Sequence, residues 1–90
     1  RETAIVLAGQ PEIAETLARK VVAAVQHLRK MDLVKPPGVA ETIDWARTLA
    51  FLGAQDLTEN LARDTLGAVV KDRDDLEMVH DAVREVTSGG

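Results

Sequence analysis

Few side chains in this sequence could act in catalysis or bind a metal. We consider Glu77 and His80 first, because their spacing suits a metal site. A Glu-x-x-His motif supplies part of the di-iron site of helical bundles, which needs two such motifs and two further glutamates. Here the motif occurs once, and the other histidine, His27, has no acid three residues before it. We therefore expect Glu77 and His80 to be exposed or interface residues, and we expect no metal in this chain.

Other common catalytic groups are absent or badly placed. The sequence has no cysteine, which excludes thiolate zinc sites and cysteine nucleophiles. The one serine, Ser88, lies in the tail, which excludes serine hydrolase chemistry. A P-loop requires a glycine followed by lysine, and no glycine here is. We do not expect this chain alone to be an enzyme.

We expect residues 1–90 to form a single domain, and its composition argues against two classes of partner. The net charge is −4, and tryptophan and phenylalanine occur once each with no tyrosine, which argues against nucleic acid as a partner. No apolar run approaches the roughly 20 residues of a membrane span, and there is no signal-peptide pattern. We therefore expect no membrane partner and a cytoplasmic location.

Apolar residues recur at helical spacing along most of the chain, which predicts an all-α fold. The pattern predicts a small bundle of four main helices and a short leading helix. The expected segments are 1–8, 11–31, 39–52, 56–70 and 72–86.

Capping residues suggest where these helices begin. Pro11 suits the first turn of the second helix. The fourth begins either at Asp56, which would form a capping box with Glu59, or at Thr58. Asp72 is the expected N-cap of the fifth.

Single residues within these segments suggest how the helices pack. We expect Trp45 to lie in the core, with an interface as the alternative. Gly67 is expected to mark a close approach of two helices, and residues 35–37 to form a structural bend.

Charge is unevenly distributed along the chain. Residues 19–35 carry five cations and one acid, a balance of +4, whereas residues 71–85 carry three cations and six acids, a balance of −3. This pattern suits docking between copies, positive side to negative side, or two ordinary solvated faces.

Three stretches together resemble a known family. Residues 28–47 read LRKMDLVKPPGVAETIDWAR, residues 64–75 read DTLGAVVKDRDD, and residues 1–6 read RETAIV. They resemble the C-terminal helical lid of MoxR-type AAA+ ATPases, whose lids carry closely similar KPP and DWA motifs. The resemblance covers residues 1 to 80, and its KPP–DWA stretch is specific at subfamily level.

The resemblance implies a lid that packs beside the nucleotide site of an ATPase core. In that family ATP, with Mg, lies between core and lid, and neighbouring subunits form a homo-oligomeric ring, usually a hexamer. The proteins resemble chaperones that mature client complexes, often alongside a von Willebrand factor A domain protein. The core motifs are absent here, so the parent protein would hydrolyse ATP.

The resemblance also suggests which residues would lie near the nucleotide. AAA+ lids commonly carry a sensor-2 arginine near the start of the helix that corresponds to residues 38–52. Ala40 is the best match to that position, so the arginine is missing. Lys35 and Arg47 are the nearest cations, and Arg47 lies about 10 Å further along the axis. The expected cofactor-binding region is therefore Lys35, Ala40, Glu41 and Arg47.

Two other functions stay open from the sequence. A stand-alone helical protein–protein adaptor fits the acidic, aromatic-poor composition, and a helix-turn-helix DNA-binding protein fits only the number of helices. The chain begins with Arg1, and we expect it to be a piece of a larger ATPase.

Overall fold

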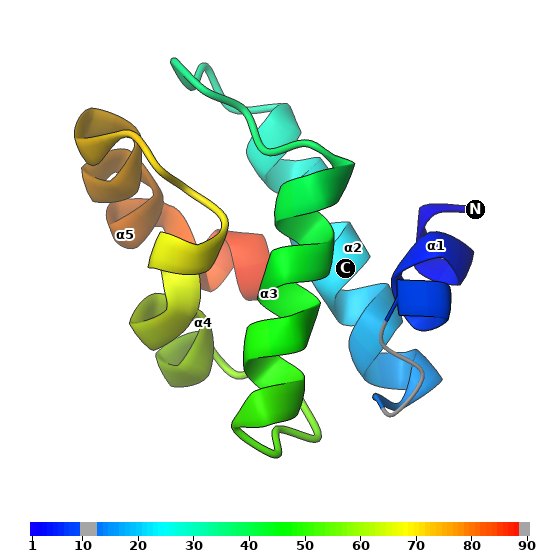
Figure 1. The fold of residues 1–90 in the computed structure, drawn as a ribbon. Helices are drawn as coiled ribbons and strands as arrows, with labels where there is room; N and C mark the ends of the chain where they lie inside the picture. The colour runs from blue at the N-terminus through cyan, green and yellow to red at the C-terminus, as the bar shows by residue number, and fades with distance from the viewer. Residues whose placement is uncertain (10–12, 89–90) are drawn as a thin grey trace.

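The chain folds into five α-helices and one short 3₁₀ turn in a computed structural model that describes residues 1–9 and 13–88 (Figure 1). The predicted all-α class and the small helical bundle are confirmed, and the described residues form no strand. The elements are α1 (Glu2–Gly9), α2 (Glu15–Arg29), α3 (Val39–Phe51), α4 (Glu59–Thr65), η1 (Leu66–Ala68) and α5 (Arg73–Ser88).

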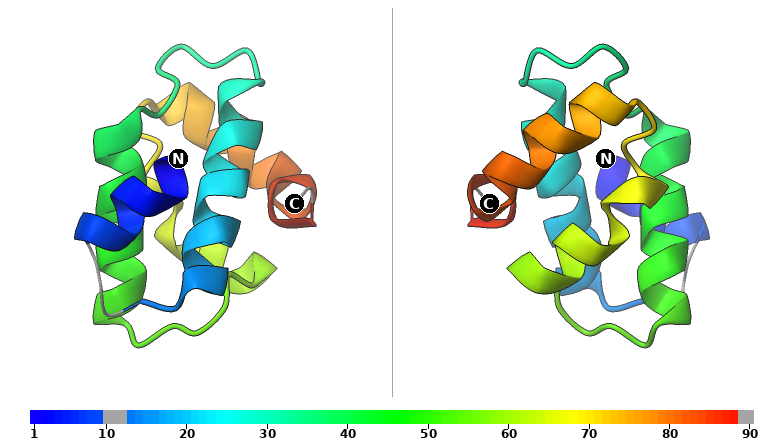
Figure 2. Two further views of the ribbon diagram at one scale, coloured as in Figure 1. Left: turned by 90° about the vertical axis from the view of Figure 1, so that its right-hand side faces the viewer. Right: turned by 90° about the vertical axis from the view of Figure 1, so that its left-hand side faces the viewer.

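Helices α2 and α3 form a central antiparallel pair, joined by the loop of residues 30–38 at one end (Figure 2). Helix α1 packs across one side of this pair, and α4 and α5 cover the opposite side. Helix α5 also packs on α2, whereas η1 packs on α3. This arrangement closes a single core between the two sides.

The core takes residues from every helix, because each helix turns its apolar stripe inward. Burial of a Leu or Val side chain contributes about 1.5–3 kcal/mol, so this core accounts for most of the stabilising energy. Trp45 is completely buried at its centre, which confirms the expectation of a core position. The other large side chains that are fully buried are Leu17, Leu28, Leu49, Leu66, Val6, Val21, Val25, Val69, Val70, Val79 and Val83.

Helix α2 is shorter than the sequence pattern indicates. It begins at Glu15, because Ala14 is extended (ψ 145°), and it ends at Arg29. Ile13 is buried although it precedes the helix. An apolar residue can thus continue the helical period without being helical, which is why a start at residue 11 was wrong. Pro11 itself lies outside the described residues.

Helix α4 begins after Thr58, which confirms one of the two predicted starts. The Thr58 hydroxyl accepts the N–H of Leu61 at 3.2 Å. The alternative capping box on Asp56 is wrong, because the Asp56 carboxylate instead accepts the N–H of Leu57 and pairs with Lys20.

The predicted helix of residues 56–70 is interrupted. It changes to a 3₁₀ turn at Leu66, which lets Leu66, Val69 and Val70 all face the core. Gly67 is exposed, and a Cβ placed on it would meet no atom within 4 Å. The expected close helix approach at Gly67 is therefore wrong.

The remaining helix ends follow their local signals. The Asp72 carboxylate accepts the N–H of Asp75 at 3.0 Å, which confirms Asp72 as the cap of α5. Gly53 follows α3 with φ 70°, the left-handed conformation that glycine adopts most easily. None of the helices in the described part of the chain is both long and apolar enough to span a bilayer.

Candidate functional site

Lys35 lies in the loop of residues 30–38, and α5 fixes its backbone. The N–H groups of Val34 and Lys35 donate to the two carboxylate oxygens of Asp75, each at 2.8 Å. Asp75 is only 1% exposed, whereas the side chains of Val34 and Lys35 face solvent. The loop backbone is thus anchored from beneath while the Lys35 cation stays outside.

Ala40 and Glu41 lie in the first turn of α3. Ala40 is exposed, and its methyl group offers no charge to a ligand. The Glu41 carboxylate accepts the N–H of Gly38 at 2.8 Å, which satisfies one of the free donors at the start of the helix. Glu41 therefore has a structural task, and the geometry gives it no contact that points to a cofactor.

Arg47 is exposed two turns further along α3. Its guanidinium donates to the Asp44 carboxylate at 3.3 Å, a surface pair of the kind that contributes little stability. These residues therefore bond to three different partners: Lys35 to Asp75, Glu41 to Gly38 and Arg47 to Asp44. Within the part of the chain that the structure describes, no hydrogen bond joins the four expected site residues to one another.

A partly buried ion pair that the sequence did not single out lies beside the start of α3. The Arg29 guanidinium donates to both carboxylate oxygens of Glu2 at 2.7 Å, and its Nε donates to the carbonyl of Pro37 at 2.8 Å. The Thr42 hydroxyl donates to Glu2 at 3.0 Å. These contacts tie α1 to α2, to α3 and to the connecting loop.

The electrostatics of this pair follow from its geometry. The hydrogen bonds from Arg29 lower the pKa of Glu2, and Glu2 in turn raises the pKa of Arg29. The two residues are 27 positions apart, so no local spacing signals the contact.

A shallow hollow of about 470 Å³ lies next to this ion pair. Ile5 and Val39, each 41% exposed, give it an apolar wall. The carboxylate of Glu2 is already paired, which leaves a guanidinium and an amide as the polar groups of the lining. Such a surface suits binding of a partner more than bond cleavage. The lining residues are Arg1, Glu2, Ile5, Gln26 and Val39.

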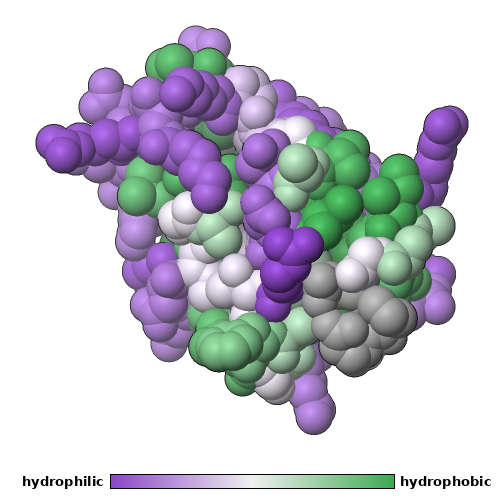
Figure 3. Space-filling view, viewed as in Figure 1, coloured by the Kyte–Doolittle hydropathy of each residue, from purple (hydrophilic) through white to green (hydrophobic). Residues whose placement is uncertain are grey.

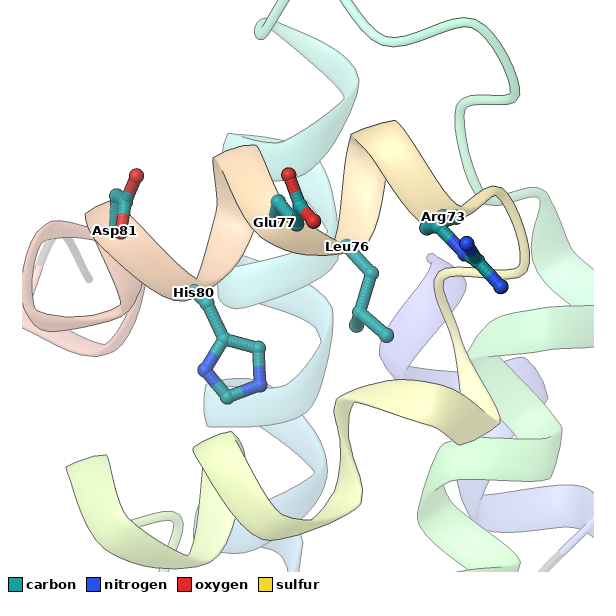
Figure 4. A pocket seen from close by; sticks show the side chains of 5 residues that line it. All are labelled: Arg73, Leu76, Glu77, His80 and Asp81. Atoms are coloured by element: carbon teal, nitrogen blue, oxygen red, sulfur yellow. The ribbon is translucent and has the colours of Figure 1, made fainter.

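A second hollow, of about 560 Å³, lies on the outer side of α5 (Figure 4). Glu77 and His80 both line it, but their side chains point in different directions in Figure 4. Within residues 1–9 and 13–88, no three side chains of His, Cys, Asp or Glu are grouped so that they could hold a metal ion. We call the space between Arg73, Leu76, Glu77, His80 and Asp81 the α5 hollow.

Comparison of the chain with protein-family models, curated proteins and solved structures finds no match.

Proposed function

We propose that this chain is the C-terminal lid of a MoxR-like AAA+ ATPase. In this role it covers a nucleotide site whose catalytic groups belong to the core, and it conveys the state of the bound ATP and Mg to the rest of a ring. The isolated chain does not turn over ATP, because the P-loop and Walker B residues belong to the core.

The observation that carries the proposal is an uncovered apolar surface at the start of α3. This is the segment that resembles the nucleotide-facing part of AAA+ lids. Figure 3 shows hydrophobic surface over α1 and the adjoining part of α3, and Ile5 and Val39 are exposed there. Covering apolar side chains with a partner lowers the free energy, because it removes apolar surface from water. An ATPase core that packs on this surface would provide that cover.

The missing sensor-2 arginine limits what the lid does for catalysis. Ala40 is exposed in that region and carries no charge. Lys35 is anchored on α5, and Arg47 lies two turns away beside Asp44. We propose that this lid senses nucleotide through packing, while cations of the core stabilise the phosphate charge.

The remaining parts of the proposal follow from the family resemblance. Copies of the parent ATPase assemble into a ring, for which a hexamer is the usual form, in the cytoplasm. The ring remodels or matures client complexes, and a von Willebrand factor A domain protein is a candidate partner.

The test is hydrogen–deuterium exchange on the parent ATPase, with and without a non-hydrolysable ATP analogue. We expect slower exchange in residues 38–43 when the analogue binds, because the core closes on this surface. Residues 59–65, on the other side of the α2–α3 pair, serve as the internal reference. Equal exchange of residues 38–43 in both states would contradict a nucleotide-sensing lid.

A stand-alone adaptor is the second candidate, and one observation favours it. Phe51 is 89% exposed and Leu52 54% exposed at the end of α3, away from the proposed core-facing surface. Exposed aromatic residues of this kind often mark protein interfaces. The reading frame upstream of Arg1 separates the two candidates. A P-loop and Walker B encoded there support the lid, and a start codon beside Arg1 supports the adaptor.

A further inference from the structure

Three consecutive exposed residues project from one end of the bundle. We call Val34, Lys35 and Pro36 the loop tip; they lie between the buried residues Leu33 and Pro37. The loop stands clear of the helices in Figure 1. Val34 is 69% exposed, beside a solvent-facing lysine. The loop tip therefore offers an apolar side chain next to a cation.

The loop tip is held in one conformation. Asp75 accepts the N–H groups of Val34 and Lys35, and Arg29 donates to the carbonyl of Pro37. Burial of a carboxylate is costly unless hydrogen bonds offset it, and here both bonds serve an exposed loop. A segment fixed in advance loses little entropy when it binds, which suits a recognition element.

The α5 hollow has the complementary chemistry. All three of Leu76, Glu77 and Asp81 line the hollow, and in Figure 4 Leu76 projects from one side of it while the carboxylates of Glu77 and Asp81 project from the other. Along the exposed outer side of α5 four acids outnumber two arginines, which gives a local charge of −2. These residues are Asp74, Glu77, Asp81 and Glu85, with Arg73 and Arg84.

Within one molecule the loop tip is held on the other side of α5 from Glu77. Asp75, which holds the loop tip, lies about 200° around the helix from Glu77, at 100° per residue. We propose that the loop tip of one copy docks in the α5 hollow of the next, with Val34 on Leu76 and Lys35 beside the carboxylates. This inference goes beyond the lid proposal and does not depend on it.

A contact between two different surfaces has a distinctive consequence. Each copy keeps a free loop tip and a free hollow, so association continues into rings or open chains and does not stop at a dimer. The contact is small, and interfaces below about 1,200 Å² are typically weak. We therefore expect concentration-dependent association of the 90-residue chain near 1 mM, weakened by about 0.5 M salt.

The decisive experiment mixes two variants, followed by sedimentation equilibrium. Lys35→Glu disables the loop tip, and the double change Glu77→Lys with Asp81→Lys disables the hollow. Each variant alone should associate at least about tenfold more weakly than the unchanged chain, because attraction becomes repulsion. Mixed together, the two variants should recover association, since each loop tip then meets a hollow of opposite charge on the other variant.

Matched controls separate this contact from general charge effects. Arg47→Glu changes the net charge as Lys35→Glu does but lies on α3, and it should leave association unchanged. Lys35→Gln should also weaken association. It adds no carboxylate near Asp75, so it tests the contact even if the Lys35→Glu variant fails to fold. The proposal would be overturned if the unchanged chain stayed monomeric, or if Lys35→Glu and Arg47→Glu had equal effects. Failure of the mixture to recover association would overturn it as well.

Discussion

The carboxylate of Asp75 accepts the backbone N–H of Lys35 at 2.8 Å, a contact between residues 40 positions apart. The second oxygen of the same carboxylate accepts the N–H of Val34. One buried side chain of α5 therefore sets the path of the loop between α2 and α3. The C-terminal end of α2, which carries basic side chains, and the acidic first turn of α5 therefore lie close together within one molecule.

Asp75→Asn should destabilise the fold. An asparagine can accept one N–H through its oxygen, but its amide would point a donor at the other, which leaves a buried donor unsatisfied. We expect a loss of about 1–3 kcal/mol in the free energy of unfolding, measured by urea denaturation. The control is Asp74→Asn, a change at the neighbouring exposed residue. Equal stability of the two variants would contradict the anchoring role of Asp75.

Glu2→Gln should reduce the free energy of unfolding near neutral pH. It should also make that free energy less sensitive to a fall in pH. Arg29 lowers the pKa of Glu2 in the folded chain below its unfolded value of about 4.3. The contribution of Glu2 is thus present above about pH 4.3 and is lost as the pH falls through the lower, folded pKa.

Urea denaturation at a series of pH values from neutral downward measures this effect. The unchanged chain should lose stability more steeply in acid than the Glu2→Gln variant. Asp56→Asn is the control, because Lys20 also lowers the pKa of Asp56 but that pair is exposed. A Glu2→Gln variant as acid-sensitive as the unchanged chain would refute the assignment.

Local signals predicted the helices but not the contacts that join them. Apolar spacing predicted every helix, and Asp72 caps α5 as expected. The same signal set the start of α2 too early, because Ile13 is buried outside the helix. Burial alone cannot tell a helical residue from an extended one beside it.

The expected site was less predictable than the fold. Among the described residues no hydrogen bond joins the four residues taken from the family resemblance, whereas Glu2 and Arg29 are directly paired. The sequence offers fifteen acids and eleven cations, and which of them pair depends on the packing of distant helices. Spacing along one helix carries no information about such pairs.

Thr65→Val should destabilise the fold, because it removes a hydrogen bond inside the core. The Trp45 indole N–H donates to the Thr65 hydroxyl at 2.8 Å, and both residues are buried. Valine keeps the shape but leaves the indole donor without a partner, at a cost of about 1–3 kcal/mol.

Denaturation followed by Trp45 fluorescence measures the cost of the Thr65→Val change. Thr16→Val, an exposed change on α2, is the control. A second measurement replaces Trp45 with Phe and follows unfolding by circular dichroism. Thr65→Val should then cost less, because the orphaned donor is gone. An undiminished cost would show that the threonine acts through another contact.

Two glycine substitutions should have opposite signs. Gly53 has φ 70°, a conformation that costs other residues about 1–2 kcal/mol, so Gly53→Ala should destabilise by that amount. Gly67 has no such φ, and its Cβ position is open, so Gly67→Ala should stabilise by about 0.4–1 kcal/mol by restricting the unfolded chain. Each glycine is the control for the other, since the chemical change is the same. Thermal unfolding of both variants measures the difference, and a destabilised Gly67→Ala would restore the close helix approach that the structure rejects.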